Sequence, residues 1–124
     1  YERSRRLASA LAETGVGRGD TVSVLLPNVP AMLESHYGVP MSGAVLHSIN
    51  TRLDAAIIAF QLDHAGTKVV IVDTEFLTLL RQALALASVT PLVVTSADPE
   101  FAGPPVPPHD LDYETFLAGG DPDF

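Results

Sequence analysis

Three glycines alternate with other residues in the run Gly15-Val16-Gly17-Arg18-Gly19, and similar spacings occur in loops that cradle phosphate groups. Such a loop follows a strand and opens a helix, because the helix N-terminus then faces the phosphates. Here the order is reversed, since the glycines follow a helical pattern and precede a strand pattern. The run therefore predicts a turn between a helix and a strand, and no phosphate site.

Histidine side chains could supply metal ligands or a general base, and the four in this chain are His36, His47, His64 and His109. Their gaps of 11, 17 and 45 residues match neither two ligands on one helix face nor a zinc loop, so no metal site is expected. His47 lies near the end of an apolar strand pattern. A hydrogen-bonded histidine at the rim of the core is favoured there over a catalytic base, and both interpretations stay open.

Polar side chains also follow two strand patterns, at the edge where open α/β sheets bind ligands. The first loop, Pro27-Asn28-Val29-Pro30, lacks glycine for close phosphate approach, and helix capping is favoured over lining a crevice. The second, Asn50-Thr51-Arg52, predicts that Arg52 ties loop carbonyls or a carboxylate together. Asp110 and Asp112 lie in a proline-rich stretch that would not hold them at a fixed separation. The sequence thus assigns no catalytic, cofactor-binding or metal-binding residue.

The composition restricts the class of protein. The 124 residues suffice for one domain. The net charge of the chain is −8. Residues 98–124 hold seven of the 15 acidic residues and no Lys or Arg, so residues 1–97 are close to neutral. Because nucleic-acid binding needs clustered Lys and Arg, a nucleic-acid partner is not expected. No apolar run approaches the roughly 20 residues of a membrane span. Cysteine is absent, which is consistent with a reducing compartment, and we expect a cytoplasmic location.

The elements that position these residues follow from alternating patterns. Apolar strand patterns at 21–26, 44–47, 68–73 and 91–95 alternate with helical patterns that begin near residues 2, 30, 54 and 75. This alternation predicts an α/β fold with a mostly parallel sheet joined by helical crossovers. The unalternating run 69–72 is typical of a strand covered on both faces.

Two helical patterns carry apolar stripes, one with Leu33, Tyr37 and Met41 and the other with Leu53, Ile57, Phe60 and His64. Burial is predicted for a set of residues on the apolar strands and stripes: Val24, Leu25, Ile57, Val70, Ile71 and Leu80.

The last part of the chain differs in composition. Residues 98–124 contain six of the ten prolines, and only 113–117 could form a helical turn. We therefore divide the chain into an α/β subdomain, residues 1–97, and an acidic proline-rich connector, residues 98–124.

The order of several segments closely resembles the early part of the large N-terminal domain of acyl-CoA synthetases, which belong to the adenylate-forming superfamily. The resemblance runs continuously over residues 1–97 and more loosely to Phe124. The segments that carry it are Tyr1–Leu11, Gly15–Val22, Leu26–Asn28, Gly43–Leu53 and His64–Asp73.

The resemblance implies an AMP-forming ligase of fatty-acid or other carboxylate metabolism that uses ATP, Mg²⁺ and CoA. In such an enzyme a carboxylate attacks the α-phosphate of ATP, and the thiol of CoA then displaces AMP from the acyl-adenylate. The family's Ser/Thr/Gly-rich phosphate loop, which ends in Pro-Lys-Gly, does not occur here, and Lys68 is the only lysine. No residue therefore receives a catalytic role by resemblance.

Two functions remain open from the sequence. The first is an N-terminal fragment of the ligase, which we expect to be inactive alone and to bind no cofactor. Its expected partners are the remainder of the same enzyme and, in a homo-oligomer, a second copy of the chain. The alternative is a freestanding non-enzymatic α/β module that binds a partner through a sheet edge or its acidic tail.

Overall fold

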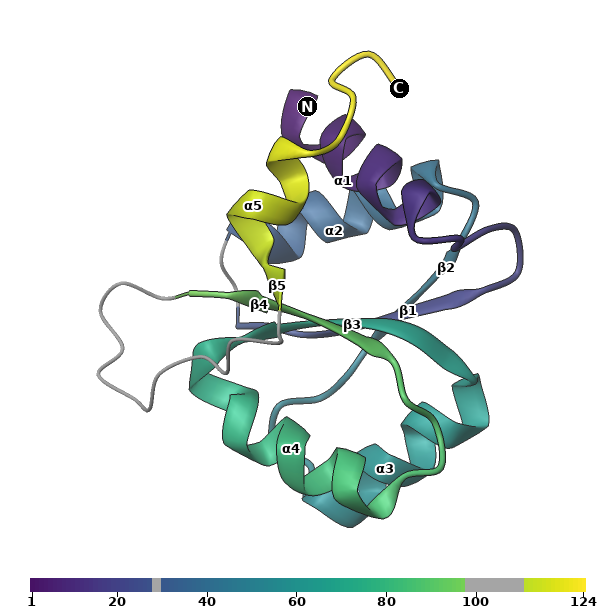
Figure 1. Ribbon diagram of the computed structural model, residues 1–124. Coiled ribbons are helices and arrows are strands. Elements are labelled where there is room, and N and C mark those ends of the chain that lie inside the picture. Colours follow the sequence, from purple (N-terminus) through teal and green to yellow (C-terminus); the bar gives the residue numbers. More distant parts are fainter. Residues whose placement is uncertain (28–29, 98–110) are drawn as a thin grey trace.

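A five-stranded sheet forms the centre of the molecule in the computed structural model, which describes residues 1–27, 30–97 and 111–124 (Figure 1). The strand order is β2-β1-β3-β4-β5 and all four strand pairs are parallel. Helices α1, α2 and α5 cover one face, and α3 and α4 cover the other (Figure 1). The elements are α1 Glu2–Glu13, β1 Thr21–Leu25, α2 Pro30–Met41, β2 Val45–Ser48, α3 Ala55–Ala65, β3 Thr67–Asp73, α4 Leu77–Leu86, β4 Leu92–Ser96, β5 Leu111–Asp112 and α5 Tyr113–Ala118.

The predicted parallel α/β sheet is confirmed, and the first four strands begin and end within two residues of their predicted bounds. Every residue of β1 is buried, as are six of the seven in β3. Val70 of β3 lies opposite Ser23 of β1 and Val93 of β4. β3 therefore has a neighbour on both edges and a helical layer on both faces, which explains its unalternating apolar sequence.

Caps at the helix ends agree with the residue types found there. The Asp54 carboxylate accepts a hydrogen bond from the backbone N–H of Ile57 at the start of α3, and Gly66 ends that helix in the left-handed conformation, with φ of 61°. Asp73 accepts from the backbone N–H of Glu75. A 3-10 turn at Thr74–Phe76 follows, so α4 begins two residues later than the predicted helix.

Burial matches the prediction for five of the six selected residues, and Ile57 is the exception. Its side chain is 45% exposed, and Phe60 on the same stripe is 69% exposed. The buried residues of α3 are instead Ile58, Ala59 and Leu62. The prediction failed because α3 is apolar on nearly every side, so periodicity alone does not select the face that meets the sheet. Packing against α4 and the sheet selects it.

Helices α1 and α2 pack closely because α2 carries a glycine at the contact. A Cβ atom at Gly38 would lie 2.8 Å from Leu7 Cδ2 and 2.9 Å from the backbone oxygen of Ser4. Residues Ala31, Ser35, Gly38 and Val39 form the buried side of α2. The predicted stripe of Leu33, Tyr37 and Met41 lies on the exposed side of the same helix.

Part of the predicted connector forms regular structure. β5 pairs with β4, and Tyr113 and Leu117 of α5 are buried in the core between the sheet and α1. The predicted helical turn at 113–117 is confirmed as α5, whereas the strand was not expected. Residues 98–110 lie outside the described residues, and the domain division after residue 97 stays a prediction.

An ion-pair cluster fixes α5 to the first helical layer. The guanidinium of Arg3 on α1 contacts the Glu34 carboxylate of α2 at 2.6 Å and the Glu114 carboxylate of α5 at 2.6 Å. The hydroxyl of Tyr113 donates to Glu34 at 2.8 Å, and burial, followed by the carboxylate of Glu34, raises the pKa of Tyr113 well above its usual range. Three helices therefore meet at one cluster, in which a single guanidinium bridges two carboxylates.

Within the described part of the chain, every helix is too short or too polar to cross a bilayer.

Replacement of Ile71 by Ala tests the central strand. Ile71 is fully buried in β3, so the variant should lose about 2–5 kcal/mol of unfolding free energy in urea denaturation. Ile57→Ala is the matched control, because it removes the same atoms from a half-exposed site and should cost less than about 1 kcal/mol. Equal costs at the two positions would contradict the assignment of β3 to the core.

Candidate functional site

The carboxyl ends of the strands form the edge at which open parallel sheets bind ligands. There the Asn50 Oδ1 atom accepts a hydrogen bond from the backbone N–H of Arg52 at 2.9 Å, which closes the loop after β2. At the end of β3, the buried Asp73 carboxylate is used in the same way, since it accepts from the backbone N–H of Glu75 at 2.9 Å. Both side chains therefore shape backbone turns. The Asn28 cap predicted after β1 lies outside the described residues.

The prediction for Arg52 is not met. Within 1–27, 30–97 and 111–124, no hydrogen bond or ion pair of its guanidinium is found, and the side chain is exposed. The loop is held by Asn50 through the backbone, so the arginine is not needed to close it. Arg52 is thus a solvated cation at the carboxyl edge of the sheet.

A chain of three polar side chains crosses the sheet beneath α3. The Ser23 Oγ atom of β1 lies 2.9 Å from His47 Nδ1 of β2 and 2.8 Å from Thr67 Oγ1 of β3. Ser23 and Thr67 are buried. Burial lowers the pKa of His47, and a hydrogen bond with the Gln61 side chain of α3 partly opposes that change. The neutral imidazole thus joins adjacent strands and the helix above them.

The Ser23–His47 distance is that of a nucleophile and its general base. Ser23 is nevertheless fully buried in a central strand, so a substrate carbonyl has no route to its Oγ atom. Its hydroxyl is also shared with Thr67. The arrangement therefore satisfies polar groups inside the sheet, and His47 acts as a hydrogen-bonded histidine at the rim of the core.

The other histidines are separated from this chain. His36 lies exposed on α2, and His64 at the end of α3 stacks on Phe60 with ring centroids 5.9 Å apart. His109 lies outside the described residues. In the part of the chain that the structure describes, no three His, Asp or Glu residues gather in a group that could hold a metal ion.

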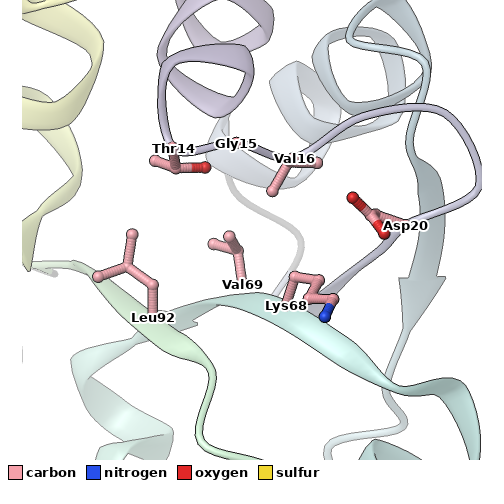
Figure 2. Close-up of a pocket in the computed structure, with 7 residues that line it drawn as sticks. All are labelled: Thr14, Gly15, Val16, Asp20, Lys68, Val69 and Leu92. Atoms are coloured by element: carbon pink, nitrogen blue, oxygen red, sulfur yellow. The ribbon is translucent and has the colours of Figure 1, made fainter.

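A cavity of about 530 Å³ lies at the opposite, amino-terminal edge of the sheet (Figure 2). The turn between α1 and β1 forms one wall, and the starts of β3 and β4 form the other. Gly15, with φ of 91°, allows the turn, and the Asp20 carboxylate closes it by accepting from the Gly17 backbone N–H at 2.9 Å. The predicted helix-to-strand turn is confirmed. The lining residues are Thr14, Gly15, Val16, Asp20, Lys68, Val69 and Leu92.

The described residues do not fit the triphosphate of ATP. Lys68 is the chain's only lysine, and it stands at the second position of β3, five residues before the strand ends at Asp73. At about 3.3 Å per residue, this separates its backbone from the ligand-binding edge by roughly 17 Å. Tight binding of a triphosphate requires several converging donors, and the described carboxyl edge offers a single solvated cation, Arg52.

Sequence reasoning did not find Ser23 and Thr67. The available signal was a hydroxyl at the centre of the apolar run 21–26, since a polar residue in a strand covered on both faces needs a partner. The identity of that partner depends on strand register, which places Ser23 opposite His47. Nothing in the local sequence around Ser23 specifies that register.

Comparisons with known proteins identify the family. Residues 1–116 match the family model described as AMP-binding enzyme. This chain belongs to the AMP-binding enzyme family. Over its whole length it is 44% identical to the peroxisomal acetate/butyrate–CoA ligase AAE7 of Arabidopsis thaliana and 42% identical to the acetate–CoA ligase CCL3 of Humulus lupulus. The chain spans 24% of the length of each of these relatives.

Solved structures show the same fold for this segment of the AMP-binding enzyme family. The anthranilate–CoA ligase AuaEII, in complex with anthranoyl-AMP, superimposes with a TM-score of 0.84 at 21% identity, covering 98% of this chain and 22% of its own. The Brucella canis acyl-CoA synthetase gives a TM-score of 0.80 at 26% identity, covering 98% of this chain and 21% of its own. The predicted resemblance to acyl-CoA synthetases is confirmed.

The His47 site predicts a pH dependence of stability. Its folded pKa lies below the value of about 6.5 for an unperturbed histidine, so the unfolded chain binds this proton more readily. The contribution of His47 is therefore complete above about pH 6.5 and is lost as the pH falls from there toward the folded pKa.

Urea denaturation between pH 5 and 8 checks this dependence. His47→Gln should flatten the decline in unfolding free energy below about pH 6.5, whereas His36→Gln, at an exposed site, should retain it. Parallel curves for the unmodified chain and His47→Gln would contradict the prediction.

Proposed function

We propose that this chain is the early N-terminal quarter of an ATP-dependent acyl-CoA ligase. The observation that carries the proposal is the match of the whole chain, at 42–44% identity, to proteins named as carboxylate–CoA ligases. The parallel sheet supplies a rigid platform whose carboxyl edge is the usual ligand-binding side. Because the described residues offer no ATP cradle, the role of this quarter is to support catalytic loops supplied by the rest of the ligase.

The reaction follows from the family. A carboxylate and ATP form an acyl-adenylate and pyrophosphate, and CoA then converts the adenylate into a thioester with release of AMP. Adenylation provides a good leaving group on a carboxylate that is otherwise a poor acyl donor. We propose Mg²⁺ as the counter-ion for the phosphates. Residues of this chain carry none of these steps directly.

A fatty or other carboxylic acid is the proposed substrate, and the names of the relatives favour a short aliphatic one. Two of them are named for acetate or for acetate and butyrate, and a third is named a butyrate–CoA ligase. For location we retain the cytoplasm, on the absence of cysteine. The peroxisome is the competing location, because the first and third of these relatives are named peroxisomal. Microscopy of the tagged protein distinguishes the two compartments.

The 124-residue chain alone should neither activate a carboxylate nor bind ATP tightly. Its net charge of −8 opposes a polyanion, and the donors that stabilise developing negative charge, worth about 2.7–4 kcal/mol each in known enzymes, are missing from its described ligand edge. Pyrophosphate exchange with acetate, butyrate and longer acids should remain at background, and calorimetry should show no micromolar ATP binding. Turnover or micromolar binding would place the active site within this chain.

Exchange of segments tests the function directly. In a swapped ligase, this chain replaces the matched quarter of the Arabidopsis acetate/butyrate–CoA ligase. We expect AMP-forming activity with acetate or butyrate, because the fold and 44% of the matched residues are retained. The same ligase without this quarter is the control and should be inactive. A soluble, folded swapped ligase without activity would instead support the freestanding-module alternative.

A further inference from the structure

Helix α3 turns an apolar stripe to solvent. The residues that this helix buries are Ile58, Ala59 and Leu62, whereas Ile57 is 45% and Phe60 69% exposed. The sequence carries the stripe, but the fold buries the adjacent side of the same helix. The exposed side of α3 therefore has the composition of an interface that the described part of the chain does not use.

The exposed residues of α3 have the spacing of a contact between two helices. Ile57, Phe60 and His64 are separated by three and four residues, as are the a and d positions of a coiled coil. The Phe60 and His64 rings are stacked with their centroids 5.9 Å apart. Ala56 is also exposed and leaves room for a larger side chain to pack on the helix. We define the α3 face as Ala56, Ile57, Phe60 and His64.

The charged residues at the two ends of α3 favour an antiparallel partner of the same sequence. Arg52 and Asp54 stand at the start of the helix, and Asp63 and His64 stand at its end. In an antiparallel pair with two-fold symmetry, Arg52 of each copy lies beside Asp63 of the other, and Asp54 lies beside His64. A parallel pair would instead place Arg52 against Arg52 and Asp63 against Asp63, and like charges repel.

Arg52 and Asp63 are both available for such a pair. Arg52 is exposed, and within the described part of the chain no hydrogen bond or ion pair of its guanidinium is found. The Asp63 carboxylate is partly exposed and accepts from the backbone N–H groups of Ser88 and Val89 at 2.9 and 3.0 Å. Because these donors are uncharged, a cation can still pair with Asp63.

The layer that carries the α3 face does not share the acidity of the whole chain. Residues 49–90, which contain α3 and α4, hold three Lys or Arg and four Asp or Glu, so their net charge is −1. Residues 98–124 hold seven of the 15 acidic residues, and α5 within them covers the opposite face of the sheet (Figure 1). Salt screens charges more than about 10 Å apart, so the total charge of −8 does not prevent a contact through α3.

We propose that the α3 face is the contact surface of a homodimer, in which α3 packs antiparallel on α3 of a second copy of the chain. Phe60 of each copy packs on Ala56 and Ile57 of the other, and two Arg52–Asp63 pairs flank the apolar contact. The helix has 11 residues, so the contact is small and the dissociation constant should be micromolar. The proposal goes beyond the ligase function and does not depend on it.

Matched substitutions test the contact in the swapped ligase. Phe60→Glu should raise the dissociation constant of the dimer by roughly tenfold or more in sedimentation velocity, because each dimer receives two carboxylates in its apolar centre. Leu86→Glu on α4 is the control at similar exposure, 64% against 69%, and should leave the constant nearly unchanged. A swapped ligase that is monomeric at about 100 μM, a dimer that Phe60→Glu does not weaken, or equal effects of the two variants would overturn the proposal.

Cross-linking tests the antiparallel arrangement. The chain contains no cysteine, so one introduced thiol reports one position. With Ile57 facing Phe60 of the other copy, the two copies of position 57 lie within one helical turn along the axis, and those of position 64 lie roughly 16 Å apart. A short bismaleimide should therefore cross-link Ile57→Cys and leave His64→Cys uncoupled. The reverse result, or no cross-link at either position, would overturn the proposal.

Hydroxyl-radical footprinting identifies any other occupant of the α3 face. Oxidation of Phe60, measured by mass spectrometry, should be slowed at high protein concentration and should recover on dilution. Protection of Phe60 in a monomeric swapped ligase would assign the face to another segment of the same polypeptide and overturn the proposal. The same measurements on the 124-residue chain give a second, independent reading.

Parallel assays of CoA-ligase activity distinguish failure of the inference from failure of the proposed function. An inactive swapped ligase whose dimer is weakened by Phe60→Glu would support the dimer and count against the function. An active ligase that remains monomeric would support the function and overturn the dimer.

Discussion

The rest of the structure depends on the burial of β1 and β3 on both faces. Each of these strands has a parallel neighbour on both edges, so its backbone hydrogen bonds are formed within the sheet. Its side chains then need an apolar layer above and below. Parallel neighbours also require long crossover connections, which are the helices themselves. The requirement to cover both faces thus explains the two helical layers seen in Figure 1.

Covering a sheet does not use every side of the covering helices. α2 and α3 are apolar around most of their circumference, and each buries one side against the sheet or a neighbouring helix while Leu33, Tyr37 and Phe60 remain exposed. At the α1–α2 contact, Gly38 brings the helix axes close together. The Arg3 cluster then holds α5 across the same layer. The layer formed by α1, α2 and α5 is therefore held together by packing and by charge.

The polar side chains that could bind a ligand are divided between the two edges of the sheet. Lys68 lies beside the cavity at the amino edge. Ligands of such sheets bind at the carboxyl edge, where Asn50 and Asp73 accept hydrogen bonds within backbone turns and Arg52 is exposed to solvent. In the centre, His47 is neutral and shares the Ser23 hydroxyl with Thr67. This distribution supports the proposal that the segment carries part of a ligase scaffold and that the phosphate-binding groups come from other parts of the enzyme.

Local sequence determined the first four strands, the parallel architecture and the caps, because unalternating β-branched runs, Asp54 and Gly66 express preferences that act over a few residues. Family membership was also accessible, through the order of segments from Tyr1 to Asp73. Tertiary structure alone decided the orientation of α3, since Ile57 and Ile58 are equally apolar and only packing against α4 and the sheet buries Ile58. It also decided the partners of Ser23 and the burial of Tyr113 in the core. The Ser23–His47 and Tyr113–Glu34 contacts join residues 24 and 79 positions apart in the chain, and no local preference encodes contacts across such distances.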